Sequence, residues 1–94
     1  MKRRTVDLVA ALDELAVAPL ATLLRAGIRG ERCDIYRCPV AVWLAQRGFP
    51  GAQVYDGQVY WNSVGVILPP SVGQLLRWFD TGDHGSLAAA RRSS

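Results

Sequence analysis

Two cysteines and a single histidine are the residues with the clearest chemical potential in this chain. Cys33 and Cys38 are separated by four residues, and His84 is the only histidine. A structural zinc site needs four ligands, usually with two to four residues between neighbouring cysteines, so this set would still need an acidic ligand. Two free thiols that pack as small apolar side chains are the simpler interpretation. We therefore expect no metal and no cofactor.

Cys38 could also serve as a nucleophile. It stands directly before Pro39, where a helix is expected to begin, and a helix N-terminus beside Arg37 would stabilise a thiolate. A nucleophilic thiol also needs a base, and His84, oriented by Asp83, is the only histidine available. Nothing in the sequence brings these residues together. We assign no catalytic residue and keep a thiol-dependent enzyme or metal site using Cys38 and His84 as a third alternative.

Aromatic residues give the stronger indication of a binding surface. Tyr55, Tyr60 and Trp61 lie within seven residues of one another. Successive side chains of a strand face opposite sides of a sheet, which puts Val59 and Trp61 on one face and Gln58 and Tyr60 on the other. One face must pack on helices, so the other is expected to present aromatic side chains that anchor a protein partner or stack on a base. Cross-strand pairing that only stabilises the sheet is the competing interpretation.

Apolar residues at helical spacing predict four helices. Thr5 is the predicted N-cap of the first, and a glycine ends the second. The predicted ranges are 6–17, 19–27, 39–48 and a fourth helix that begins at Pro70 or Ser71. On the fourth, Trp78 lies beside the apolar stripe, which places it at the border of the core or in an interface.

The middle of the chain has the pattern of a β-meander. Residues 54–55 and 58–61 flank Asp56-Gly57, a preferred two-residue hairpin turn, and residues 64–68 form a third β-rich run before Pro69. Residues 28–37 are predicted to be a polar loop, and residues 86–90 a short helical turn. The sequence thus predicts a single α+β domain over residues 1–94, with three N-terminal helices, a small antiparallel sheet and a C-terminal helix.

The net charge of +3 comes from the two ends of the chain. Residues 5–90 hold six arginines against eight acidic residues, a net charge of −2. Residues 1–4 and 91–94 are basic, and we expect them to be disordered ends that could contact phosphates. No apolar run reaches the length of a membrane span, and Asp7, Asp13 and Glu14 interrupt any signal-peptide pattern, so we expect a cytoplasmic protein with no membrane partner.

Two short motifs carry a resemblance to other proteins. The first is Arg37-Cys38-Pro39 with the helix that follows it. The second runs from Leu68-Pro69-Pro70 to Phe79-Asp80-Thr81-Gly82. With these motifs, roughly residues 20–88 resemble small uncharacterised proteins of high-GC actinobacteria and of their phages or mobile elements. The resemblance implies a bacterial or phage origin, and it transfers no activity and no site residue.

A non-enzymatic binding or regulatory module that acts through protein–protein contacts is the function that we expect, because ionisable groups suited to catalysis are scarce and scattered. The expected binding residues are Tyr55, Tyr60, Trp61, Trp78 and Arg47. A homodimer is plausible since a small core gains stability by association. The alternative is a winged-helix-like nucleic-acid binder, with Arg47 on the exposed side of the third helix and the hairpin as wing. Its weakness is the long segment between the second and third helices.

Overall fold

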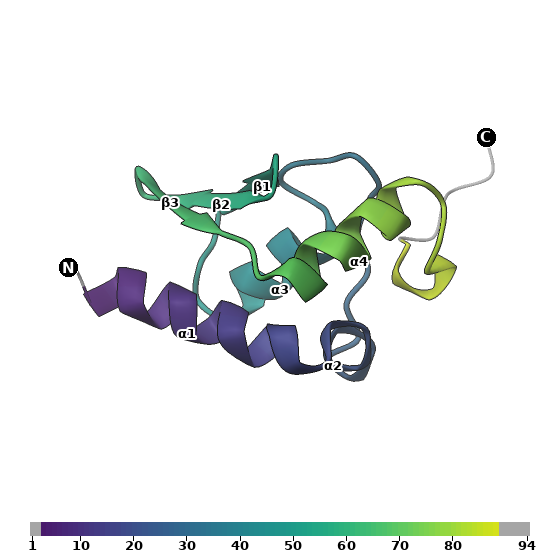
Figure 1. Cartoon of the computed structure of the whole chain (residues 1–94), viewed down its shortest axis with the longest axis horizontal. Helices are drawn as coiled ribbons and strands as arrows, with labels where there is room; N and C mark the ends of the chain where they lie inside the picture. Colours follow the sequence, from purple (N-terminus) through teal and green to yellow (C-terminus); the bar gives the residue numbers. More distant parts are fainter. Residues whose placement is uncertain (1–2, 89–94) are drawn as a thin grey trace.

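The computed structural model describes residues 3–88, with side chains from Thr5 onward. Within this range four α-helices and a three-stranded sheet follow one another in the predicted order (Figure 1). The elements are α1 (Arg3–Val17), α2 (Pro19–Arg25), α3 (Pro39–Gln46), β1 (Gln53–Tyr55), β2 (Gln58–Trp61), β3 (Val64–Ile67) and α4 (Pro70–Asp80), followed by a 3-10 helix, η1 (Gly85–Leu87). The α+β class is therefore confirmed.

The start of α1 differs from the prediction. The helix already begins at Arg3, so Thr5 lies inside it and is not its N-cap. Neither Arg3 nor Arg4 opposes helix formation, since arginine is a good helix former, and nothing before Thr5 stops the helix. Residues 1–2 and 91–94, the rest of the predicted basic ends, lie outside the described residues.

Proline marks the start of the other three helices, as predicted. Pro19, Pro39 and Pro70 each stand in the first turn, where a missing N–H costs no intrahelical hydrogen bond. Gly27 follows α2 with a φ of 71°, a conformation that glycine adopts without strain. None of the helices within residues 3–88 has both the length and the apolar character needed to cross a membrane.

The sheet is an antiparallel meander in the order β1-β2-β3. Two-residue turns join its strands, and all four turn residues have positive φ: 54° and 73° at Asp56-Gly57, and 49° and 65° at Asn62-Ser63. Positive φ at both central positions is the type I′ geometry that matches the twist of a hairpin. The registers pair Val54 with Val59 and Val59 with Val66.

The core lies between the helices and one face of the sheet. Helix α3 contacts β1 on one side and α2 on the other, and α4 packs on α1 and α2 (Figure 1). The predicted apolar stripe of α4 is buried, with Phe79 and Val72 fully inaccessible. Helix α1 contributes Leu8, Leu12 and Leu15 to the same core.

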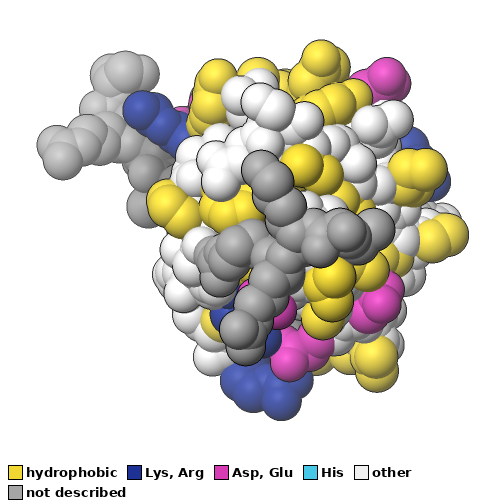
Figure 2. Space-filling model, turned by 90° about the vertical axis from the view of Figure 1, so that its left-hand side faces the viewer, with side chains coloured by type: hydrophobic (Ala, Val, Ile, Leu, Met, Phe, Trp, Pro, Cys, Tyr) yellow, Lys and Arg dark blue, Asp and Glu magenta, His cyan; other side chains and the backbone are white. Residues whose placement is uncertain are grey.

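Some apolar side chains remain outside the core. Val17 is 87% exposed, Ile67 76% and Val6 50%. Figure 2 views the end of the molecule that holds the N-terminal part of α1, and it shows exposed hydrophobic side chains at several places. Scattered apolar residues of this kind are ordinary, so only their grouping around a particular element can indicate a function.

The segment between α2 and α3, predicted as a polar loop, is fastened to the C-terminal end of α4. Gly30 donates its N–H to the Leu87 carbonyl and forms a bridge with Ala88. The Arg32 guanidinium donates to three carbonyls that follow or end α4, those of Phe79 (2.6 Å), Gly82 (3.1 Å) and Asp83 (3.0 Å). A cation suits the negative end of a helix dipole. These contacts hold residues 31–38 against α4.

Candidate functional site

Cys38 is the N-cap of α3 and is almost completely buried, with 4% of its surface exposed. Its Sγ accepts a hydrogen bond from the Ala41 N–H at 3.4 Å. Burial raises the pKa of this thiol to about 11, and the hydrogen bonds from the first turn of α3 lower it by less. Desolvation therefore outweighs the helix terminus here, and the thiol stays protonated at neutral pH. This arrangement suits packing better than nucleophilic attack.

Cys33 is exposed, and His84 lies near Trp78, outside the pocket that the two cysteines line. The Cys33 N–H donates to Asp80 Oδ1 at 2.9 Å. The His84 ring is half-buried, with its centroid 6.1 Å from that of Trp78. Cys33 and Cys38 line one pocket whose walls do not include His84. Within the described part of the chain, no three His, Cys, Asp or Glu side chains are placed to bind a metal ion together.

Tyr55 and Tyr60 lie side by side on the face of the sheet that points away from the core. Their ring centroids are 5.3 Å apart, and Tyr55 is 50% exposed. The Tyr60 ring lies over Gly65 of β3, because a Cβ built at Gly65 would stand 3.3 Å from Tyr60 Cε1. Ile67 continues this face, which we call the outer sheet face and define by Tyr55, Tyr60, Gly65 and Ile67. The predicted alternation of the strand is therefore confirmed: Val59 is buried and Tyr60 is on the opposite side.

The other three expected binding residues are not part of the outer sheet face. Trp61 turns toward the core side, donates its Nε1–H to the Pro50 carbonyl at 3.1 Å and packs edge-on against Phe49. Arg47 pairs with Glu14 at 2.6 Å and lies over the ring of Trp43.

Trp78 is 48% exposed on α4. Its half-exposed ring agrees with the prediction that it lies beside the apolar stripe rather than on it. Of the expected binding residues, the structure therefore brings only the two tyrosines together.

The outer edge of β3 is open among the residues that the structure describes. Leu68 N–H donates to the Gly57 carbonyl at 2.9 Å, and hydrogen-bonded pairs alternate along an antiparallel ladder. The backbone groups of Ile67 and Gly65 therefore point away from β2. The opposite edge is covered, because Val54 of β1 donates to the Ile35 carbonyl at 2.8 Å.

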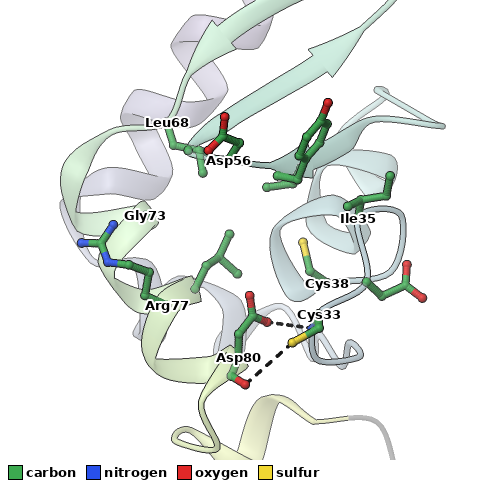
Figure 3. Close-up of a pocket in the computed structure, with 13 residues that line it drawn as sticks. Cys33, Ile35, Cys38, Asp56, Leu68, Gly73, Arg77 and Asp80 are labelled. Carbon is green, nitrogen blue, oxygen red and sulfur yellow. Dashed lines mark hydrogen bonds between the residues drawn. The ribbon is translucent and has the colours of Figure 1, made fainter.

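A cavity of about 540 Å³ lies between residues 33–38, the β1–β2 hairpin and α4 (Figure 3). Its apolar and aromatic lining comes from Ile35, Cys38, Val54, Tyr55, Leu68 and Leu76. Its charged lining comes from Asp34, Asp56, Asp80 and Arg77. The contacts of Arg32 and Cys33 with the end of α4 set the distance between two of the walls.

The charged side chains that line this cavity point in different directions, some into it and some away from it. In Figure 3 the Asp80 carboxylate and the Cys38 sulfur point into the cavity, and Asp56 lies on the side opposite Asp80. The Arg77 guanidinium extends away from the cavity, along α4 toward Gly73. Asp34 uses one carboxylate oxygen to accept from Tyr36 and Arg37 N–H groups. The cavity therefore presents more acceptors than donors.

Sequence reasoning did not find this cavity. It placed Cys33 in a polar loop, treated Asp56 only as a turn residue, and named Asp80 only as part of a short motif. The residues lie 20 to 50 positions apart along the chain, and no spacing pattern connects them. The comparisons with protein-family models, curated proteins and solved structures found no match for this chain.

Proposed function

We propose that this chain is a protein-binding module that adds a strand of another polypeptide to the open edge of β3. The observation that carries the proposal is the outward direction of the Gly65 and Ile67 backbone groups, next to the Tyr60 ring that lies over Gly65. An extended segment can pair with such an edge through its backbone, and neighbouring side chains give the contact its specificity.

The side chains of β3 include none of those that usually prevent strand addition. Natural edge strands are protected by lysine, proline, bulges or inward charges. Residues 64–67 hold none of these, and Ile67 is 76% exposed. The rigid Tyr60 ring, which lies over Gly65, adds contact area beside the edge at a low cost in side-chain entropy.

A second copy of this chain is the occupant that we favour. In a two-fold register centred on Val66, Gly65 and Ile67 of one copy lie opposite Ile67 and Gly65 of the other. Each of these pairs exchanges both of its backbone hydrogen bonds. The outer sheet faces of the two copies then form one surface.

The charge of the sheet disfavours the nucleic-acid alternative. No Lys or Arg occurs from residue 48 to residue 76, a range that contains the whole sheet. Phosphate contacts need such cations, and a wing or stacking platform without them has no electrostatic attraction for a nucleic acid. Arg47, the cation expected to read DNA, is paired with Glu14 and stacked on Trp43.

Sedimentation velocity from low to high micromolar concentration tests the proposal. We expect concentration-dependent dimers of the native chain and monomers of Ile67→Lys, because the two lysines would be like-charged diagonal neighbours on one face of the joined sheet. The matched control is Val17→Lys, since Val17 is 87% exposed on α1, and it should dimerise like the native chain.

A native chain that stays monomeric overturns self-pairing. Affinity capture then decides about other partners: proteins retained by both the native chain and Ile67→Lys would overturn binding at the β3 edge. Salt-sensitive binding of labelled duplex DNA, measured by fluorescence anisotropy, would favour the nucleic-acid alternative instead.

A further inference from the structure

The cavity between residues 33–38, the β1–β2 hairpin and α4 has the size of a ligand site. Its volume of about 540 Å³ falls within the range of small-molecule sites, roughly 300–1,000 Å³. Gly73 forms part of the α4 wall, and a glycine there leaves room that any side chain would reduce. The cavity adjoins the sheet at Tyr55 and at Leu68, which follows β3, but none of its lining residues lies in β3, so the cavity does not depend on strand pairing.

The floor of the cavity is apolar and neutral. Leu76, Val54 and Leu68 are at most 8% exposed, and Cys38 is 4% exposed with its sulfur directed into the cavity. A desolvated surface of this kind favours aliphatic groups and excludes an unpaired charge. A charged ligand must therefore place its charge at the rim and its carbon chain on the floor.

Among the side chains at the rim of the cavity, hydrogen-bond acceptors outnumber donors. Asp80 uses Oδ1 to accept from Cys33 N–H at 2.9 Å. This contact fixes the carboxylate in its inward direction, and Oδ2 has no partner within residues 3–88. Asp56 lies across from it, while the guanidinium of Arg77 points away. An ionised carboxylate only accepts hydrogen bonds, so the group that complements this rim is a cation with N–H donors.

We propose that this cavity binds an alkyl ammonium or alkyl guanidinium group, with the aliphatic stem on the apolar floor and the cation at Asp80 and Asp56. Such a group combines an apolar stem with a charged head that stays near water. The same chemistry occurs in a free small amine and in a lysine or arginine side chain of a protein.

Titrations followed by amide chemical shifts of the labelled chain test this proposal. The probes are agmatine as a free amine, N-acetylarginine methylamide as a protein side chain, and hexanoate as an anion of similar length. We expect the two cationic probes to shift residues 33–38, 54–57 and 73–80, and hexanoate to leave them unchanged. Tighter binding of the capped arginine than of agmatine would identify a protein side chain as the source, and the reverse order a free amine.

Two variants probe the mechanism. Asp80→Asn keeps an oxygen for the Cys33 N–H and removes the charge, so affinity for the cationic probes should fall about tenfold. Gly73→Leu should abolish binding by filling the cavity, and it should not unfold α4 because leucine is the better helix former. Asp83→Asn is the matched control: it makes the same change in charge just beyond α4, outside the cavity, and should bind like the native chain.

The proposal is overturned by any of four results, three of which concern where and how tightly the probes bind. These are equal affinities of Asp80→Asn and the native chain, shifts confined to acids outside the cavity such as Asp83, or stronger binding of hexanoate than of the cations. Absence of binding by both cationic probes at millimolar concentration also overturns it. None of these results bears on dimerisation through β3, so the two proposals fail independently.

Discussion

Replacement of Arg32 by alanine should destabilise the chain more than any other change of a partly exposed charge. The Arg32 Nε donates to the Phe79 carbonyl at 2.6 Å in a partly buried position, and the guanidinium lies 4.7 Å from the centre of the Phe79 ring. A single side chain thus ties the loop before α3 to the C-terminal end of α4, and both segments line the cavity.

The expected loss can be worked out contact by contact. A hydrogen bond from a charged group contributes about 1.5–3 kcal/mol, the cation over an aromatic ring about 0.5–1 kcal/mol, and the helix dipole about 0.3–1 kcal/mol. The bonds to Gly82 and Asp83 are exposed and water replaces them. The Phe79 carbonyl also accepts from Gly82 N–H, so it does not become an unsatisfied buried group. Because these contributions overlap, we expect a loss of about 2–3 kcal/mol in the free energy of unfolding.

Urea denaturation followed by tryptophan fluorescence measures this loss, and thermal unfolding should show a fall of roughly 10–20 °C in Tm for a domain of this size. The matched control is Arg37→Ala in the same loop, whose exposed ion pair with Glu31 is 3.5 Å long. It should cost less than about 0.5 kcal/mol. Arg32→Lys keeps the charge but loses the planar fork, and should fall between the two. Equal stability of the Arg32→Ala and Arg37→Ala variants would refute this account of how the loop is held.

Two further substitutions test other parts of the fold. In Gly30→Ala the new Cβ would lie 2.5–2.7 Å from three backbone atoms of residues 37–39, where α3 begins, so urea denaturation should show a loss of about 3 kcal/mol or more in the free energy of unfolding. In Gly73→Ala the new Cβ meets no atom closer than 3.8 Å, and the free energy of unfolding should rise by about 0.5–1 kcal/mol. Equal losses of stability in the two variants would contradict the close approach of Gly30 to residues 37–39. The Cys38 pKa of about 11 lies above the value in the unfolded chain. The contribution of this buried thiol to the free energy of unfolding is therefore fully present below about pH 9 and is lost as the pH rises to about 11. Between about pH 9 and pH 11 the native chain should therefore lose stability relative to Cys38→Ala. At neutral pH a thiol reagent should modify Cys33 well before Cys38. Parallel pH profiles of the stability of the two chains, or faster modification of Cys38, would contradict the burial of the Cys38 thiol.

Local chemistry explains the parts of the fold that the sequence predicts. Pro39 and Pro70 restrict φ to the helical range at the first turn, and Asp56-Gly57 tolerates the positive φ of a tight hairpin. These effects act within a few residues of the chain, so they can be recognised without knowledge of the tertiary structure. The face of the sheet that Tyr60 occupies follows from the period of two for the same reason.

The cavity, and the hydrogen bonds that join the loop before α3 to the end of α4, could not be predicted in this way. Arg32 meets Phe79 across 47 positions, and Cys33 meets Asp80 across the same separation. Which of several arginines reaches a helix end depends on how the loop leaves α2, and that path is decided by the tight packing of Gly30 against the start of α3. The thiol of Cys38 shows the same limit, because the helix terminus favours a low pKa and only the tertiary structure shows that burial prevails.

The β3 edge and the cavity meet at one point, and this contact constrains what a partner can do. Leu68 follows Ile67 at the end of β3, donates its N–H to the Gly57 carbonyl, and also lines the cavity with Gly57. An extended segment paired with β3 would therefore have one of its ends beside Leu68, at the end of the sheet that borders the cavity. The same geometry keeps the two contacts separable, because Ile67→Lys changes only the edge and Asp80→Asn changes only the rim.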